Sequence, residues 1–219
     1  MKKKQIVVVG LGRFGSSVCS ELYKLGHEVM ALDLDPDKVE DMAEFASQAT
    51  VADATDKSQL KALGVRNFDQ AIIAIGDDLQ ASVLCTLMLK EIGLEKVWVK
   101  ARDIQHKKIL EKVGADRVIQ PEYEMGIRVA HHVDSEKIVD YIDLSKDYSI
   151  VEMAATQKIA GKSLLQLDIR VKFSCIILAL KRGEDVNIAP HPNDVIKSGD
   201  ILVVMGHRKH LKRLEEKML

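Results

Sequence analysis

The stretch Ile6-Val7-Val8-Val9-Gly10-Leu11-Gly12-Arg13-Phe14-Gly15 decides the fold. Its four β-branched apolar residues predict a buried strand, and three glycines follow in the spacing G-x-G-x-x-G. An amphipathic helical pattern begins at once and ends at Gly26. In this context the first glycine permits a tight turn, the second lets the backbone approach a pyrophosphate, and the third lets helix and strand pack closely. The stretch therefore predicts a βα turn whose helix N-terminus receives phosphates.

An acidic residue supports this interpretation. Residues 27–33 form a second apolar strand pattern that ends at Asp33, about 20 residues after the glycines, where a carboxylate that binds a ribose belongs. A second anion beside Asp33 would be repelled, so the sequence predicts ribose hydroxyls rather than a 2′-phosphate. The alternative is that Asp33 only ends the strand, or caps a turn before Pro36.

The composition favours a helix-covered parallel sheet. The chain has 219 residues, 47% of them hydrophobic but only 4% aromatic, so its core must be mainly aliphatic. The formal net charge of −1 gives no electrostatic case for binding nucleic acid. No apolar run approaches the ~20 residues that cross a bilayer, and no signal peptide precedes the first strand. We therefore expect a cytoplasmic protein, or one held at a membrane only by a partner, whose isolated thiols Cys19, Cys85 and Cys175 stay reduced.

Strand and helix patterns alternate through the first 120 or so residues. Strands are predicted at 6–9, 27–33, 49–52, 70–75, 97–101 and 117–119. Helices are predicted after the glycine turn and at 36–46, 56–63, 78–92 and 104–113. Alternation of this kind predicts an α/β fold, a Rossmann-like doubly wound parallel sheet.

Ligands in such sheets bind outside the carboxyl ends of the strands. Those ends carry the glycine turn, Asp33, 53–55, Ile75-Gly76, Lys100-Ala101 and Glu122. Together these residues can hold an adenine nucleotide, but they include no obvious pair for proton transfer.

Three of these residues have two interpretations each. Arg13 lies in the first helical turn, where it either meets a phosphate, including one held by a neighbouring subunit, or points into solvent. Asp53 and Thr55 could bond ribose or adenine edges, and Thr55 could cap the next helix; the two roles are compatible, because capping uses one side chain and binding another. Glu122 either reaches a divalent cation on a polyphosphate or is only an acid at a helix N-terminus, and spacing alone favours the second.

The last third of the chain has a different pattern. Residues 124–142 look helical with a break at 134–136, and this helix packs either on a second subunit or on its own domain. A small α+β module follows, with a strand at 149–154, a turn and short helix at 161–167, a hairpin of 174–180 and 186–189, a strand at 201–205 and a basic helix at 207–218. The predicted domains are 1–125, a bridging segment 126–145, and 146–219, whose small core would gain from dimerisation.

Other residues in this part carry weaker signals. Arg170 and Lys172 could hold a phosphate or belong to an ordinary strand edge, and the pattern favours the edge. We expect no metal site built from histidine, because His131 and His132 are adjacent on a helix and His207 and His210 lie on a basic surface helix.

Two features together resemble a known family. They are the minimal dinucleotide fold with Gly-Leu-Gly-Arg-Phe-Gly, Asp33 and 53–55, and the small module with Gly161-Lys162-Ser163-Leu164 and Gly199-Asp200-Ile201-Leu202-Val203. Over its whole length the chain resembles the RCK (regulator of potassium conductance) proteins, in particular the KtrA/KtrC-like cytosolic subunits of Ktr potassium uptake systems. Its two parts resemble the RCK N-lobe (TrkA-N) and the RCK C-lobe (TrkA-C).

The resemblance implies a regulatory subunit rather than an enzyme. Members form an octameric ring, built from dimers of N-lobes, beneath a membrane potassium-translocating partner of the KtrB/KtrD type. ATP in the N-lobe favours the active ring, and ADP favours a different ring shape. The chain would then be a homo-oligomer in the cytoplasm, peripheral to the inner face of the membrane through its partner.

The resemblance also implies roles for residues. In the family the arginine of the glycine motif reaches a γ-phosphate across the dimer, and the glutamate after the proline helps to bind a divalent cation, Mg²⁺ or Ca²⁺, which assigns a metal role to Glu122. The predicted nucleotide site comprises Gly10, Leu11, Gly12, Arg13, Phe14, Gly15, Asp33, Leu34, Asp35, Asp53, Ala54, Thr55, Ile75, Gly76, Lys100 and Glu122. Relatives bind cyclic di-AMP at the C-lobe dimer seam, and the residues that match that pocket are Asp168, Ile169, Arg170, Ile176, Ile177 and Pro190.

Two other classes of protein remain as alternatives. An NAD(H)-dependent oxidoreductase would need a substrate domain with a general acid or base, and the C-terminal module offers no convincing set of residues. A redox-sensing repressor that binds NADH and DNA is disfavoured by the near-neutral charge and the lack of a helix-turn-helix pattern.

Overall fold

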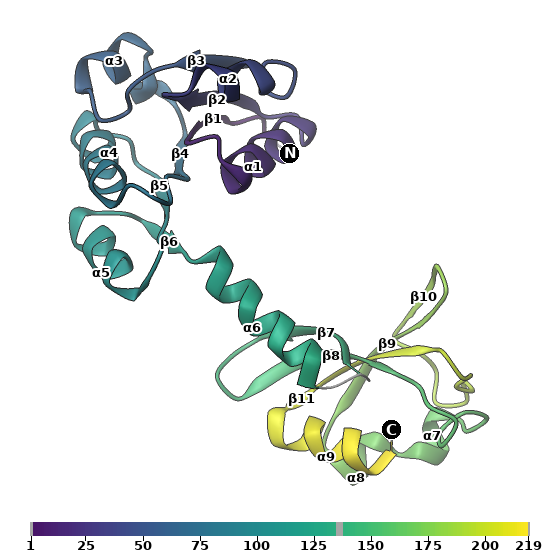
Figure 1. Cartoon of the computed structure of the whole chain (residues 1–219). Helices are drawn as coiled ribbons and strands as arrows, with labels where there is room; N and C mark the ends of the chain where they lie inside the picture. Colours follow the sequence, from purple (N-terminus) through teal and green to yellow (C-terminus); the bar gives the residue numbers. More distant parts are fainter. Residues whose placement is uncertain (1, 135–137, 219) are drawn as a thin grey trace. The chain divides into compact units, whose positions relative to one another are not determined.

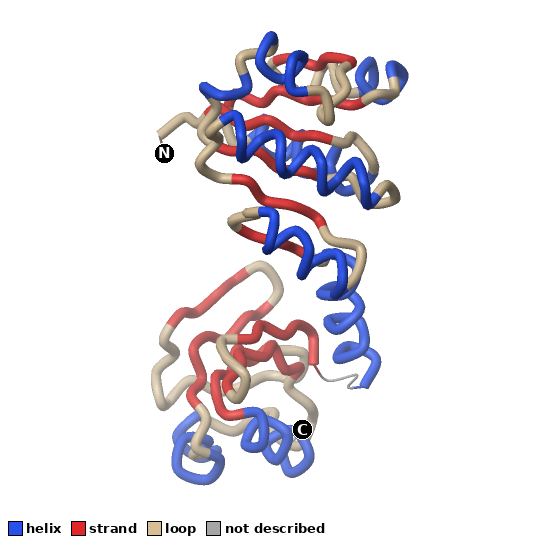
Figure 2. Tube along the Cα trace, turned by 90° about the vertical axis from the view of Figure 1, so that its left-hand side faces the viewer, coloured by secondary structure: helices blue, strands red, loops and turns tan. Residues whose placement is uncertain are grey.

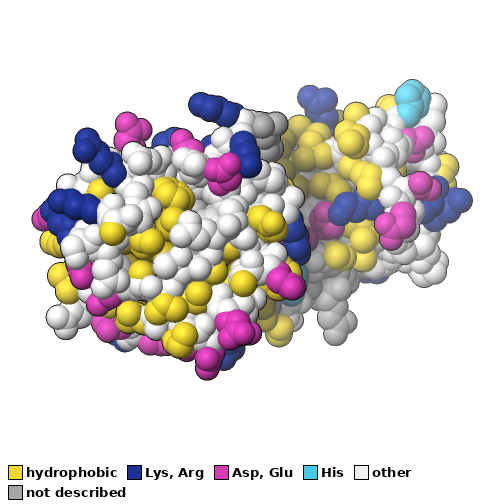
Figure 3. All heavy atoms as spheres, turned by 90° about the horizontal axis from the view of Figure 1, so that it is seen from above, with side chains coloured by type: hydrophobic (Ala, Val, Ile, Leu, Met, Phe, Trp, Pro, Cys, Tyr) yellow, Lys and Arg dark blue, Asp and Glu magenta, His cyan; other side chains and the backbone are white. Residues whose placement is uncertain are grey.

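The computed structural model describes residues 2–134 and 138–218, and Figure 1 shows the elements in chain order. The chain forms two compact units, Met1–Glu122 and Tyr123–Leu219, called here the N-terminal and C-terminal units. No helix among the described residues is both long enough and apolar enough for a bilayer crossing. Hydrophobic side chains on the face seen in Figure 3 are interspersed with charged groups of both signs.

The N-terminal unit is built on a parallel sheet of six strands. The strands are β1 (Gln5–Val9), β2 (Glu28–Asp33), β3 (Gln48–Val51), β4 (Gln70–Ile73), β5 (Val97–Lys100) and β6 (Arg117–Ile119). Their order is β3-β2-β1-β4-β5-β6, so the direction of winding reverses between β1 and β4. This is the predicted Rossmann-like doubly wound sheet, and ligands of such sheets bind at that reversal.

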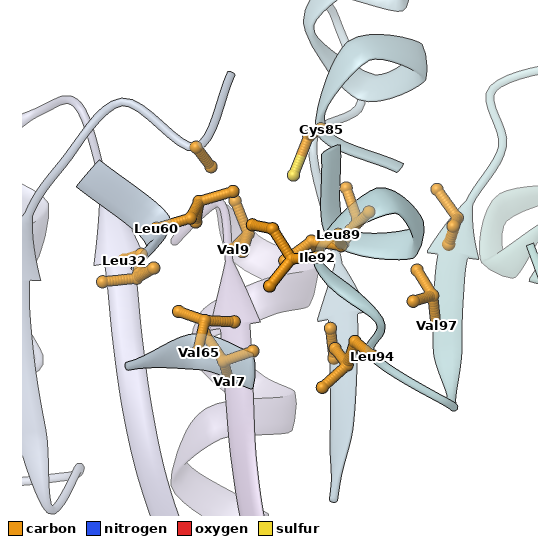
Figure 4. Packing of buried hydrophobic residues seen from close by; sticks show 14 of the residues in the cluster. Val7, Val9, Leu32, Leu60, Val65, Cys85, Leu89, Ile92, Leu94 and Val97 are labelled. Carbon is orange, nitrogen blue, oxygen red and sulfur yellow. The ribbon is translucent and has the colours of Figure 1, made fainter. Parts of the chain in front are cut away.

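Helices cover both faces of this sheet (Figures 1 and 2). Helices α1 (Arg13–Lys24) and α2 (Pro36–Asp41) lie on one face, and α3 (Lys57–Ala62), α4 (Leu79–Ile92) and α5 (Ile104–Val113) lie on the other. The two-residue period of β1 explains this division, because alternate side chains point to opposite faces. Val7 and Val9 pack with Leu60 and Leu89 on the α3–α5 side, as Figure 4 shows, whereas Val8 packs on the α1–α2 side.

Polar caps and glycines set the ends of these helices. Asp78 and Asp103 cap the N-termini of α4 and α5 by accepting from backbone N–H groups, and Gly93 and Gly114 end the same helices in the left-handed conformation. Helix α2 is shorter than predicted and ends at Asp41. The following turn still buries Met42 and Ala46 but leaves Ala43 exposed, so the apolar spacing predicted most of the buried positions but overstated the helix. A short 3₁₀ helix, η1 (Val65–Asn67), was not predicted.

The C-terminal unit holds an antiparallel sheet of five strands. They are β7 (Ile138–Asp143), β8 (Tyr148–Ala154), β9 (Ile176–Arg182), β10 (Asp185–Ile188) and β11 (Ile201–His207), in the order β10-β9-β11-β8-β7. Helices α7 (Leu164–Leu167), α8 (Ile169–Phe173) and α9 (Arg208–Met218) share one hydrophobic core with this sheet. Helix α6 (Pro121–Asp134) precedes the sheet, and Arg128 on α6 pairs with Asp140 on β7 at 3.0 Å.

Two predictions in this region were wrong. The second helical turn predicted to reach Ile142 is strand β7, in which Tyr141 pairs with Val151 and Ile142 with Ile150. The partner strand supplies hydrogen bonds that local periodicity does not show. Arg170 and Lys172 lie on helix α8 rather than on a strand edge.

Candidate functional site

The glycine turn is shaped by contacts that exclude side chains. Gly10 has a φ of +90°, and a Cβ atom there would lie 3.1 Å from backbone atoms of Ala74 and Ile75. A Cβ atom at Gly15 would lie 1.8 Å from the carbonyl oxygen of Gly10. Gly12 differs, because a Cβ there would have nothing within 4 Å. The first and third glycines are therefore needed for packing, and the second leaves the turn open on its outer side.

The N-terminus of α1 is open to a ligand. Gly12 is its N-cap in an extended conformation, and no side chain caps the helix. The first-turn N–H groups therefore point out of the helix without a side-chain acceptor, an arrangement that suits an anion. Arg13 is exposed and lies in this first turn, as predicted. It has no ion pair with any residue of the described ranges 2–134 and 138–218.

Asp33 lies directly against the glycine turn. Its Oδ2 accepts a hydrogen bond from the N–H of Leu11 at 2.6 Å, and its Oδ1 accepts from the N–H of Asp35 at 3.0 Å. Asp35 in turn caps α2 by accepting from Asp37, and its pKa is lowered mainly by a hydrogen bond from Lys38. Asp33 thus ends its strand and also lies beside the glycine turn, so the two interpretations of this residue are compatible.

Lys38 was missing from the predicted site. Its Nζ lies 3.3 Å from Asp35 and 3.9 Å from Asp33. The three-residue spacing of Asp35 and Lys38 on one helical face could have indicated this pair. Leu34, between the two acids, has a largely exposed side chain.

Asp53 and Thr55 form a closed local motif after β3. The N–H and Oγ1 of Thr55 both donate to Asp53 Oδ1, at 2.8 and 2.7 Å. The predicted capping role of Thr55 is wrong, because Asp56 caps α3 by accepting from Ser58. The motif fixes the Asp53 side chain while both residues remain partly exposed, with Ala54 buried between them.

Lys100 brings together residues from four separate segments. Its Nζ lies 2.5 Å from Glu122 Oε1 and 5.9 Å from the centroid of the Phe14 ring. A Cβ atom at Gly76 would lie 3.2 Å from the same nitrogen. Hydrogen bonding to Lys100 holds the pKa of Glu122 below its usual range. Ile75, beside Gly76, packs against the core cluster of the sheet.

The described residues do not gather into a cluster of metal-ligating side chains. The described residues contain no grouping of three or more His, Cys, Asp or Glu side chains able to hold an ion. Cys19, Cys85 and Cys175 are buried free thiols, in agreement with the prediction. Burial raises the pKa of Cys19 to about 11, so this thiol is protonated and unreactive at neutral pH.

The predicted C-terminal site residues flank one stretch of the sheet. Asp168 adopts a left-handed conformation between α7 and α8, and Arg170 is exposed on α8. Ile176 is exposed and Ile177 half-buried at the start of β9, and Pro190 is half-buried after β10. Ile169 differs from the others, because its side chain is only 5% exposed and belongs to the hydrophobic core.

Comparison with known proteins identifies the family. Residues 6–121 match the TrkA-N domain model, and residues 148–219 match the TrkA-C domain model. Ktr system potassium uptake protein A of Bacillus subtilis (strain 168) is 49% identical over 215 residues, which cover 98% of this chain and 97% of that protein. The chain belongs to the Ktr family of potassium uptake proteins. The family predicted by resemblance is thereby confirmed, and with it the prediction of a regulatory protein rather than an enzyme.

Two further comparisons agree with this assignment. Ktr system potassium uptake protein C of Bacillus subtilis (strain 168) is 48% identical over 217 residues, covering 99% of this chain and 98% of that protein. Among solved structures, the GsuK channel bound to NAD superposes with a TM-score of 0.55 at 19% identity, over 100% of this chain and 39% of that chain. At this identity the channel supports the fold alone, and the present chain spans well under half of its length.

Proposed function

We propose that this Ktr-family chain is the nucleotide-sensing subunit of a potassium uptake system. In this proposal it binds ATP or ADP at the carboxyl ends of the N-terminal strands, and the identity of the nucleotide sets the activity of a membrane potassium-translocating partner. The observation that carries the proposal is the position of Lys100, which touches Glu122 at 2.5 Å and lies near Phe14 and Gly76.

In this proposal, each residue of the candidate site contacts a different part of the nucleotide. Asp33 would accept hydrogen bonds from the ribose hydroxyls, with Leu34 and Asp35 beside it. The Asp53–Thr55 motif would contact the ribose or adenine edge. The open N-terminus of α1 at Gly12 would receive the phosphates, and Ile75 and Gly76 would border them. Lys100 would approach the phosphates as a point charge.

Glu122 is the residue that would hold a divalent cation. Mg²⁺ usually takes one or two carboxylates and fills its other positions with phosphate oxygens and water, so a single glutamate fits when a polyphosphate is present. The Glu122 side chain is 68% exposed, which leaves it free to exchange Lys100 for a cation. Ca²⁺ accepts similar oxygen ligands.

Regulation would act through assembly. We expect dimers of N-terminal units within an octameric ring, in which Arg13 of one subunit reaches the γ-phosphate held by another. ATP carries more charge than ADP, so a free cation at this point would favour the arrangement that ATP selects. Shifting a population from 1:99 to 99:1 needs ~5.5 kcal/mol of differential binding, which eight sites could share. The ring would act on a KtrB/KtrD-like subunit from the inner face of the membrane.

NAD(H) is the alternative ligand for the same site. Asp33 and the glycine turn would suit the adenosine half of NAD(H) as well as ATP or ADP. The nicotinamide half would then lie beyond the strand ends, where Lys100 and Glu122 already pair. Competition between NADH and ATP, followed by NADH fluorescence, separates these ligands.

The C-terminal unit would bind cyclic di-AMP. Arg170 and Ile176 are both exposed near the junction of α8 and β9, where the guanidinium could pair with a phosphate and the isoleucine could pack on a base. Because Ile169 is in the core, we expect it to act by shaping this surface. Arg170→Ala should weaken cyclic di-AMP binding at least tenfold, whereas Lys162→Ala, another exposed cation, should leave it unchanged.

The deciding experiment concerns Arg13. Isothermal titration calorimetry should find that the wild type distinguishes ATP from ADP, and that Arg13→Ala loses this distinction while still binding ADP. Small-angle scattering should detect a change of ring shape with ATP only in the wild type. Equal binding of both nucleotides by the wild type, with no change of shape, would refute the proposal.

A further inference from the structure

A second cavity lies at the opposite edge of the N-terminal sheet. It has a volume of about 330 Å³, and its lining includes Lys4, Arg66, Phe68, Asp69, Glu95 and Lys96. These residues precede β1, β4 and β5 or belong to η1. All strands of the sheet are parallel, so their starts lie at the edge away from the glycine turn. The cavity is therefore separate from the candidate nucleotide site.

Three cations of this lining have no partner in the part of the chain that the structure describes. The side chains of Lys4, Arg66 and Lys96 form no ion pair or hydrogen bond with residues 2–134 or 138–218. Nearby carboxylates are already engaged by other lysines, since Lys3 pairs with Glu28 at 2.9 Å and Lys90 with Asp116 at 3.0 Å. The lining thus keeps an excess of positive charge, because its three cations outnumber its two carboxylates.

The remaining lining residues define what could enter. Asp69 Oδ2 accepts from the N–H of Gln5 at 2.8 Å, so this carboxylate has a structural task at the start of β1. Glu95 contributes the other negative charge, which leaves three cations against two carboxylates. Phe68 packs partly into the hydrophobic core and gives the cavity an apolar wall.

We propose that this cavity binds a small phosphorylated anion. A guanidinium matches two phosphate oxygens at once, and lysines add point charges from other directions. The volume is at the lower end of the ~300–1,000 Å³ typical of ligand sites, which suits a phosphate or pyrophosphate group with a small organic part against Phe68. A ligand at this edge of the sheet would not compete with the nucleotide.

Calorimetry with inorganic pyrophosphate tests the site in the full chain. The protein is first saturated with ATP, so that the candidate nucleotide site is filled, and ionic strength is held constant. The double variant Arg66→Ala/Lys96→Ala should bind pyrophosphate at least tenfold more weakly than the wild type. The control Lys108→Ala/Lys158→Ala removes two exposed cations elsewhere and should bind as the wild type does.

Further measurements test whether the variant folds and whether a lipid headgroup, rather than a small anion, is the ligand. An unchanged ATP affinity and melting temperature of the cavity variant would show that its fold is intact. Equal pyrophosphate binding by the wild type and the cavity variant, or no binding by the ATP-saturated wild type, would overturn the proposal. Sedimentation with phosphatidylglycerol vesicles that depends on Arg66 and Lys96, without pyrophosphate binding, would also overturn it in favour of a lipid headgroup.

Discussion

The carbonyl oxygen of Gly10 leaves no room for a side chain at Gly15, because a Cβ atom there would lie only 1.8 Å from this oxygen. This close approach joins the start of the glycine turn to the first turn of α1. Because both partners are backbone, neither can move without shifting the strand or the helix. The third glycine of the motif is therefore a packing requirement, whereas the open position of Gly12 is available to a ligand.

Alanine at these two positions should separate stability from binding. Gly15→Ala should lower the free energy of unfolding by about 3 kcal/mol or more, the upper range of overpacking costs. Gly12→Ala should change stability by only about 0.5 kcal/mol, because the site is open and the backbone is extended. The same methyl group should nevertheless weaken ATP binding about tenfold. Denaturant unfolding and nucleotide titration test both variants, and a stable Gly15→Ala protein would contradict the packing argument.

The contact between Leu11 and Asp33 predicts a role in recognising ribose. Asp33→Asn keeps an oxygen for the N–H of Leu11 but removes the charge that would accept from ribose hydroxyls. A hydrogen bond to a charged group is worth ~1.5–3 kcal/mol, so ATP affinity should fall roughly 10- to 100-fold. The wild type should bind 2′,3′-dideoxy-ATP poorly, and the variant should bind it about as well as ATP. Asp41→Asn, an exposed site on α2, serves as the control.

Glu122→Gln should abolish the dependence of ATP binding on divalent cations. The amide keeps the size of the side chain and can still accept from Lys100, but it is a poor ligand for Mg²⁺. We expect Mg²⁺ to strengthen ATP binding to the wild type and to have no effect on the variant. Glu111→Gln on α5 is exposed and should keep the wild-type response. Equal Mg²⁺ dependence in all three proteins would exclude Glu122 as the ligand.

The Lys100–Glu122 pair also predicts a pH dependence. Lys100 lowers the pKa of Glu122 below 4.5, so the folded state binds this proton less tightly than the unfolded chain. The stabilisation by the pair is therefore fully present above pH 4.5 and is lost only as the pH falls through the lowered pKa. The difference in melting temperature between wild type and Glu122→Gln should be constant from pH 5 to 8. A difference that shrinks between pH 8 and 6 would contradict the assignment.

The sequence predicts some features well because they depend on neighbours along the chain. Most strands of the N-terminal sheet are apolar runs followed by glycine or an acid, and α5 spans Ile104–Val113 as predicted. The Leu11–Asp33 and Lys100–Glu122 contacts each join two residues that lie 22 positions apart in the sequence. A sequence could place these residues at one sheet edge, but only the packed structure gives their distances.

Other features depend on distant partners and escaped prediction. The sequence of β7 has a helical pattern, and only its pairing with β8 makes it a strand. Thr55 has a capping side chain, but its hydroxyl donates to Asp53, and the task of capping falls to Asp56. Thr55 and Asp56 could each accept from the first N–H groups of α3. The path of the chain decides which one does, and short-range patterns do not specify that path.

Asp200 and Arg182 should hold the C-terminal sheet together. Asp200 is 1% exposed, and its two oxygens accept from Arg182 Nε and Nη2 at 2.8 and 2.7 Å and from the N–H of Lys197 at 2.8 Å. Asp200→Asn would break this arrangement, at a cost of about 1–3 kcal/mol for a buried group left without its partner. The half-exposed guanidinium can turn to water, which keeps the cost below that of a fully buried pair.

Urea unfolding of the full chain at neutral pH measures this loss against Asp185→Asn, an exposed carboxylate on the same hairpin, which should be nearly neutral. Hydrogen bonding to Arg182 lowers the pKa of Asp200 below 3.8, so the wild-type advantage should persist down to that pH. It should fade only as the pH drops through the lowered value, because protonation then removes the charge that Arg182 binds. An advantage already lost at pH 5, or an equal loss in Asp185→Asn, would show that the pair is not what holds β9 to the turn before β11.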